Sequence, residues 1–163
     1  MTGNEILTLV VASGSLTLNG YNNYTGSTTI NSGATLTLSN NYSGGALQGT
    51  SGIVNNGTLN VNDLEYISSL TGTGSTTIGT GGTMQLVTNT GPWTFASNKL
   101  TISGGTLDIT NNKLVIDFTG NSDPVATLVG EIQAAYDGGK WDQPGLMSSL
   151  AADMPGSALG YAD

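Results

Sequence analysis

The carboxylates of this chain are the side chains that come closest to a catalytic arrangement. Glycoside hydrolysis uses two carboxyl groups at a controlled separation, and the candidate pairs are Asp63 with Glu65 and Asp108 with Asp117. Asp63 and Glu65 follow a predicted strand, so we expect both in a loop on the solvated surface. Asp108 lies between two residues that are predicted to point inward, so alternation directs it to solvent. Neither pair predicts a catalytic centre.

Other reactive residue types are scarce. A lyase acting on uronates needs Arg or Lys to neutralise the substrate and abstract a proton, but the chain has no Arg and its three lysines, Lys99, Lys113 and Lys140, are scattered. His and Cys are absent, which removes the commonest general base, the thiolate ligands and disulfides. We therefore predict a protein that is not an enzyme and has no cofactor.

An oxygen-rich loop around Asp137 and Asp142 is the one candidate for a cation site. The intervening Gly-Gly-Lys-Trp matches neither the EF-hand loop nor the Gly-Gly-x-Gly-x-Asp nonapeptide that binds Ca²⁺. We interpret it as a turn that ends a helix and predict no metal site.

Several aromatic residues stand where a core does not require them. Tyr21, Tyr24 and Tyr42 fall on polar turns, and Trp93 lies with Phe95 in an atypical insertion. Tyr21, Tyr24, Tyr42 and Trp93 are therefore candidates for stacking against a glycan. The competing interpretation is that they pack as satellite clusters, and the sequence leaves both open.

Charge is sparse and unevenly distributed. The net charge is −8, from eleven acids and three lysines, which disfavours nucleic acid as a partner. Residues 1–62 contain a single charged side chain, Glu5. The apolar stretch from Ile6 to Ala12 is too short to span a membrane and has no basic flank, so we expect any export signal to lie outside this sequence.

The positioning elements are short strands that repeat. A Gly, followed by an apolar-polar-apolar triplet, recurs with its last apolar residue at positions 18, 38, 61, 86 and 109, at intervals of 20, 23, 25 and 23 residues. A second strand ends at Ile30, Val54, Ile78 and Ile102, always 24 residues apart, and Thr-Gly-Ser-Thr-Thr-Ile occurs at both 25–30 and 73–78. Such a period predicts stacked turns of a coil.

The predicted fold is all-β: a right-handed parallel β-helix, or β-solenoid, of about five rungs over residues 1–122, including an entry strand and a final strand at 113–118. Gly pairs and Asn-Gly steps such as Asn56-Gly57, Gly81-Gly82 and Gly104-Gly105 are expected to form corners with positive φ. The predicted inward ladders are Leu16, Leu18, Leu36, Leu38, Leu59, Val61, Met84, Leu86, Leu107 and Ile109.

Residues 123–163 are predicted to form a helical cap and a truncated tail. Asp123 is a suitable N-cap, Pro124 suits the first helical position, and the apolar residues that follow recur on one face until Gly138-Gly139. Residues 146–154 predict a second short helix. A helix over the open end of a solenoid would block edge-to-edge growth.

The repeat from Leu16 to Leu36 resembles the autotransporter-associated β-strand repeat of very large secreted bacterial proteins, closely over residues 14–40 and more loosely to about 112. The segments 112–118 and 135–145 resemble the region that follows such repeats in surface proteins of planctomycete-like and verrucomicrobial bacteria. The resemblance implies a parallel β-helix, export and a position at the cell surface or in the matrix. It supplies no catalytic residue.

We therefore expect a non-catalytic, extracellular or cell-surface segment that acts as a structural stalk, scaffold or adhesin. Two alternatives stay open. One is a carbohydrate-binding surface, with polysaccharide or matrix components as partners. The other is a filament subunit in which Ile6–Val11 adds as a strand to the end of another copy.

Overall fold

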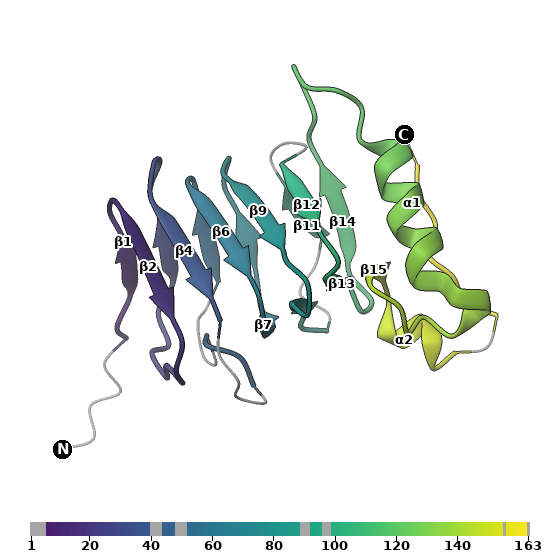
Figure 1. Cartoon of the computed structure of the whole chain (residues 1–163), viewed down its shortest axis with the longest axis horizontal. Helices are drawn as coiled ribbons and strands as arrows, with labels where there is room; N and C mark the ends of the chain where they lie inside the picture. The colour runs from purple at the N-terminus through teal and green to yellow at the C-terminus, as the bar shows by residue number, and fades with distance from the viewer. Residues whose placement is uncertain are drawn as a thin grey trace.

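The chain folds as a parallel β-solenoid of about four turns, with a helical segment near its C-terminus (Figure 1). This computed structural model describes residues 6–39, 44–47, 52–88, 99–154 and 156–162, together with the backbone of 92–95. All strand pairs within this part of the chain are parallel. The predicted all-β parallel solenoid is therefore confirmed, with about four turns instead of the predicted five rungs.

Each turn of the coil runs over three sides. The first side holds β1 (Leu9–Val11), β3 (Thr28–Ile30), β5 (Ile53–Asn55) and β8 (Leu70–Thr71), and β8 contacts β11 (Pro92–Phe95), which pairs with β14 (Lys113–Ile116). The second side holds β2 (Ser15–Leu18), β4 (Thr35–Leu38), β6 (Thr58–Val61), β9 (Ser75–Ile78) and β12 (Leu100–Ile102). The third holds β7 (Leu64–Ile67), β10 (Thr83–Leu86), β13 (Thr106–Asp108) and β15 (Gly145–Met147).

The predicted 24-residue spacing corresponds to one turn in only part of the coil. Ile78 and Ile102 are register partners, and β3 pairs with β5, but the step from Val54 to Ile78 does not join neighbouring strands. β9 pairs with β6 rather than with β5, so the two identical hexapeptides at 25–30 and 73–78 end in strands on different sides, the first and the second. β10 likewise joins the third side instead of stacking on β6. The reason is physical: strands on every side need the same alternation of apolar and polar residues, so the motif identifies a strand but not its side.

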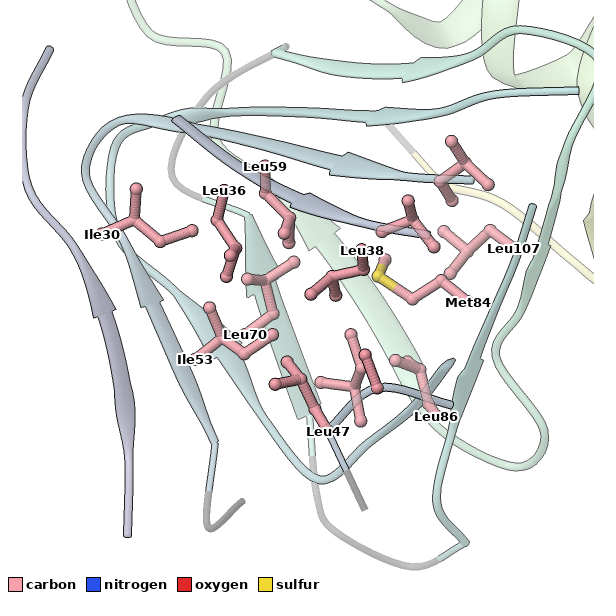
Figure 2. Packing of buried hydrophobic residues seen from close by; sticks show 14 of the residues in the cluster. Ile30, Leu36, Leu38, Leu47, Ile53, Leu59, Leu70, Met84, Leu86 and Leu107 are labelled. Carbon is pink, nitrogen blue, oxygen red and sulfur yellow. The ribbon is translucent and has the colours of Figure 1, made fainter. Parts of the chain in front are cut away.

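The core consists of apolar ladders that run through the turns (Figure 2). Leu36 stacks on Leu59, and Leu38 stacks on Val61 and then Ile78, with all of these side chains buried. Each buried leucine contributes about 1.5–3 kcal/mol relative to an exposed one. Of the predicted ladder residues, Leu16 and Leu18 are half-buried because they form the first turn, and the other eight are buried: Leu36, Leu38, Leu59, Val61, Met84, Leu86, Leu107 and Ile109.

Asn55 is a polar residue at a ladder position of the first side. Asn55, not Val54, stacks on Ile30, so Val54 is 36% exposed and Asn55 is buried. The Asn55 amide donates to the Ser75 carbonyl at 2.8 Å and to Thr76 Oγ1 at 3.3 Å, and its Oδ1 accepts the Gly57 N–H at 3.1 Å. The buried amide is thus hydrogen-bonded at both ends, which removes the cost of burying it.

The corners use glycine for two different reasons. Gly81 and Gly104 have φ of +79° and +75°, as predicted for corners in the left-handed region. Gly57 does not have a positive φ. A Cβ at Gly57 would overlap the carbonyl oxygens of Ala34 and Asn31 in the turn below. Glycine is needed at this position because the two turns lie too close for a side chain.

The C-terminal part closes one end of the coil (Figure 1). Helix α1 (Val125–Tyr136) contacts β15, and its Leu128 and Ile132 pack against the core. The N-cap is Pro124, one residue later than predicted, although Asp123 Oδ1 accepts the Val125 N–H at 2.8 Å. A short 3₁₀ turn (Asp137–Gly139) follows α1.

The predicted second helix is shorter than expected. α2 spans only Ser149–Ala152, whereas Leu146 and Met147 belong to β15. Leu146 stacks on Leu107 and so extends the ladder of the third side, which explains why this stretch is a strand. Because β15 pairs with β13, the predicted cap region 123–163 shares a sheet with the coil.

Candidate functional site

Glu65 is the carboxylate whose position differs most from the prediction. It lies on β7 with its side chain turned into the coil, and it is 0% exposed. Its Oε1 accepts the Ala46 N–H at 2.7 Å and its Oε2 accepts the Leu47 N–H at 3.2 Å. The loop position on the solvated surface that we expected for Glu65 is therefore wrong.

The missing strand on the third side explains this inward carboxylate. In the first two turns, that side has no strand in the described residues, only an isolated parallel bridge between Asn22 and Leu47. The N–H groups of Ala46 and Leu47 need acceptors, and the Glu65 side chain supplies them. Burial raises the pKa of Glu65 to about 7, although the two backbone hydrogen bonds oppose the rise.

Asp63 does not form a catalytic pair with Glu65. Asp63 is half-buried and its Oδ1 accepts the N–H of Leu64 at 2.8 Å. The two oxygens of Glu65 are both engaged by backbone groups inside the coil, away from any substrate in solvent. Glu65 can therefore act as an internal acceptor that titrates near neutral pH.

Asp108 is also buried, contrary to the expectation that it is solvated. Its Oδ1 accepts the N–H groups of Thr110 at 2.9 Å and Ser149 at 3.0 Å, and its Oδ2 accepts from the Gln85 amide. Asp117 is exposed in the segment after β14, where hydrogen bonds from the Thr119 side chain and backbone lower its pKa. Both carboxylate oxygens of Asp108 already accept hydrogen bonds from the protein, and Asp117 lies on a different segment. Asp108 and Asp117 therefore do not form a pair of catalytic carboxylates.

Asp108 belongs to a polar cluster that the sequence reasoning missed. Ser148 Oγ donates to the Thr110 carbonyl at 2.5 Å, and Thr110 Oγ1 donates to the Leu86 carbonyl at 3.0 Å. Asn112 donates to Thr110 Oγ1 at 2.9 Å and to the Val87 carbonyl at 2.9 Å. The cluster joins β13, the following turn and the start of α2, so it fastens the C-terminal segment to the coil. The sequence signal for this cluster is the group of polar residues Asp108, Thr110, Asn111 and Asn112 around Ile109.

The loop around Asp137 and Asp142 forms the end of α1. Asp137 is the left-handed C-cap with φ of 36°, and its Oδ2 accepts from Lys140 Nζ at 3.0 Å. The Asp142 carboxylate accepts from the Gln143 side chain at 2.9 Å. The interpretation of this loop as a turn that ends the helix is thus confirmed.

The structure describes the side chains of two of the four candidate aromatics, Tyr21 and Tyr24. Tyr21 is 56% exposed, whereas Tyr24 is half-buried against the core and its hydroxyl is 2.6 Å from Thr28 Oγ1. Burial raises the pKa of Tyr24. Tyr42 lies outside the described residues, and Trp93 is described only by its backbone, opposite Leu114.

Two further surface features were not singled out from the sequence. Tyr66, on the outward face of β7, is 40% exposed. Between β14 and α1 lies a cavity of about 470 Å³, lined mostly by apolar side chains and by the tail segment 158–162. This cavity lies beneath the cap, and Lys113 is the cationic residue in its lining.

Comparison with protein-family models, with curated proteins and with solved structures finds no match to this chain. Within the described residues, no helix combines the length and the apolar character needed to cross a membrane.

Proposed function

We propose that this chain is a non-catalytic structural segment, a stalk or scaffold that also offers an adhesive surface, on the outside of a bacterial cell. One observation carries the proposal: an apolar ladder core fills the coil, while the strands turn Thr, Ser and Asn outward. The carboxylates with the potential for chemistry are either used as internal acceptors, as Glu65 and Asp108 are, or stand apart.

The composition supports an extracellular position. Uncharged hydroxyl and amide side chains keep the outer faces hydrated without charge. The resemblance of residues 14–40 to autotransporter-associated repeats points to the same location.

Localisation in the bacterium that encodes the chain tests the proposal. Intact cells are treated with external protease and probed with antibodies raised against residues 6–162, with a cytoplasmic protein as control. We expect the chain to be labelled and cleaved while the control stays intact. Protection of the chain together with the cytoplasmic control would overturn the extracellular assignment.

A carbohydrate-binding surface is a second candidate because Tyr21 is exposed to 56% without a core role. Aromatic faces are suited to stacking against apolar faces of ligands. Calorimetric titration with bacterial polysaccharides should show binding, and Tyr21→Ala should weaken it. Tyr136→Ala changes another exposed tyrosine, near the other end of the chain, and should leave the binding unchanged. Absence of binding to every polysaccharide tried would remove this candidate.

A further inference from the structure

The second side of the coil carries a regular array of short polar side chains on its outer face. Its strands β2, β4, β6, β9 and β12 run side by side in one parallel sheet (Figure 1). Because side chains alternate between the two faces of a strand, the residues that alternate with the inward ladders point outward. The register of the strands arranges them in two columns, the first of Ser15, Thr35, Thr58 and Ser75 and the second of Thr17, Thr37, Asn60, Thr77 and Thr101.

Hydrogen bonds join side chains of neighbouring turns within these columns. The Asn60 amide donates to Thr37 Oγ1 at 3.4 Å, and the Ser75 hydroxyl donates to Thr58 Oγ1 at 3.4 Å. Threonine side chains have restricted rotation about χ1, and the packed ladders beneath them hold the strands in register. The polar groups are therefore in place before a ligand arrives, which reduces the conformational entropy lost on binding.

The array is accessible and uncharged. Ser15, Thr17 and Thr101 are exposed, and the other members are half-buried between their neighbours in the column. None of these positions holds a charged residue, although the chain has a net charge of −8. Lys99 directly precedes β12, and its Nζ donates to the Thr73 carbonyl at 3.3 Å. A neutral surface of hydroxyl and amide groups is complementary to a neutral partner that both donates and accepts hydrogen bonds.

The spacing of the array indicates which neutral partner it fits. Successive turns lie about 4.8 Å apart, and the two columns lie about 6.6 Å apart, which is twice the rise of a parallel strand. Both distances are close to the repeat distances of the oxygen atoms on the prism face of hexagonal ice. We propose that the outer face of the second side binds ice, with water molecules of the lattice hydrogen-bonded to the side chains of the two columns.

An ordered polysaccharide is the competing occupant, but the composition of this face favours ice. Aromatic rings provide the apolar faces that stack against a ligand, and the five strands of the second side contain no aromatic residue. Tyr21 lies in the connection between β2 and β3, outside the array. The two columns offer small hydroxyl groups at a regular spacing, which suits a lattice of water molecules.

The first side lacks such an array and so provides a matched control. Its strands have a single outward column, which holds Val10, Thr29, Val54 and Thr71 in register. Valine therefore interrupts the hydroxyl groups there. Thr29 resembles Thr37 in that both are outward, half-buried and in the middle of a strand or column.

Partitioning of the purified chain into ice tests the proposal. Ice is grown slowly from a dilute solution of the protein, and the protein concentrations of the ice and of the remaining liquid are compared by absorbance. We expect the wild type to be enriched in the ice. Thr37→Tyr should lose this enrichment, because the ring projects above the neighbouring hydroxyl groups and keeps the lattice away. Thr29→Tyr makes the same change on the first side and should keep it, and circular dichroism checks that each variant stays folded.

Thr77→Tyr adds an independent test, because it alters the same column in another turn and should also lose the enrichment. Exclusion of the wild type from ice, loss of enrichment in Thr29→Tyr, or enrichment retained in either Thr37→Tyr or Thr77→Tyr would each overturn the proposal. Binding of the wild type to crystalline cellulose or chitin that Thr37→Tyr abolishes, without enrichment in ice, would instead assign this face to a polysaccharide. None of these results would bear on the extracellular location proposed above.

Discussion

A few buried polar side chains complete hydrogen bonds that strands do not provide. Glu65 accepts the N–H groups of Ala46 and Leu47 where the third side has no strand, and Asp108 accepts from Thr110 and Ser149 where the C-terminal segment joins the coil. Removing either acceptor would leave buried donors unpaired, which is costly. Glu65 thus completes the third side where it begins, and Asp108 completes it where the C-terminal segment joins the coil.

Glu65 makes the stability of the protein depend on pH. Its pKa rises from 4.5 to about 7 on folding, so the folded state holds the proton more tightly than the unfolded state. The stabilisation is therefore fully present below pH 4.5 and is lost as the pH rises through about 7. We expect the Glu65-linked part of the unfolding free energy to fall by about 2–3 kcal/mol between pH 5 and pH 8.

Glu65→Gln checks this by urea unfolding at several pH values. Glutamine retains the acceptor for Ala46 and does not titrate, so the stability of the variant relative to wild type should increase from pH 5 to pH 8. Asp142→Asn, which removes an exposed carboxylate, serves as control and should show no such trend. A constant difference between Glu65→Gln and wild type at every pH would contradict the assignment.

Asp108 and Glu65 are both buried, although the sequence predicts that both are exposed to solvent. Asp108 does alternate with the inward Leu107, as predicted, but the later segment around Ser149 covers it. The strand Leu64–Ile67 follows the preceding strand after only two residues, so the sequence predicts a loop at Glu65 instead of a new strand. Local alternation predicts which face a side chain takes, but not what a distant segment places over that face.

The strands themselves were largely predictable, but their grouping into sides was not. Alternation identified the strands at 15–18, 35–38, 58–61, 83–86 and 106–108 close to their observed bounds. Corner geometry varies between turns. It decides whether a turn has a strand on the third side, and it decides the side to which β9 belongs. Helix α1 was predictable because its apolar residues recur with the helical period inside the segment itself, so no distant contact is needed to recognise it.

Gly57 tests how closely successive turns pack. A methyl group there overlaps the carbonyls of Ala34 and Asn31 in the turn below, so Gly57→Ala should destabilise the fold by about 2–3 kcal/mol. Gly20→Ala is the matched control, since no atom lies within 4 Å of the added Cβ. Thermal unfolding measures both. Equal melting temperatures for the two variants would show that the turns are less closely packed than described.

At its C-terminal end the coil is covered by helix α1 (Figure 1). Leu128 and Ile132 of α1 are half-buried and pack against the core. A helix in this position blocks the growth of the sheets at that end.

Opening the closed end should therefore change the assembly state. Leu128→Lys with Ile132→Lys places two charges on the face of α1 that packs against the core, so we expect the cap to detach and larger, concentration-dependent species to form. Ala126→Lys with Gln133→Lys adds the same charge on exposed positions and serves as control. Light scattering that is identical for both double variants would refute a capping role for α1.

The three-sided coil is the central claim, and disulfide trapping tests it most directly because the chain has no native cysteine. Asn60 of β6 and Thr77 of β9 are register neighbours on the second side, whereas Val54 of β5 lies on the first side. Neighbouring strands lie about 4.8 Å apart, within the range that a disulfide can bridge. Under mild oxidation, the pair Asn60→Cys and Thr77→Cys should cross-link, and the pair Val54→Cys and Thr77→Cys should stay reduced. The reverse result would contradict the three-sided arrangement.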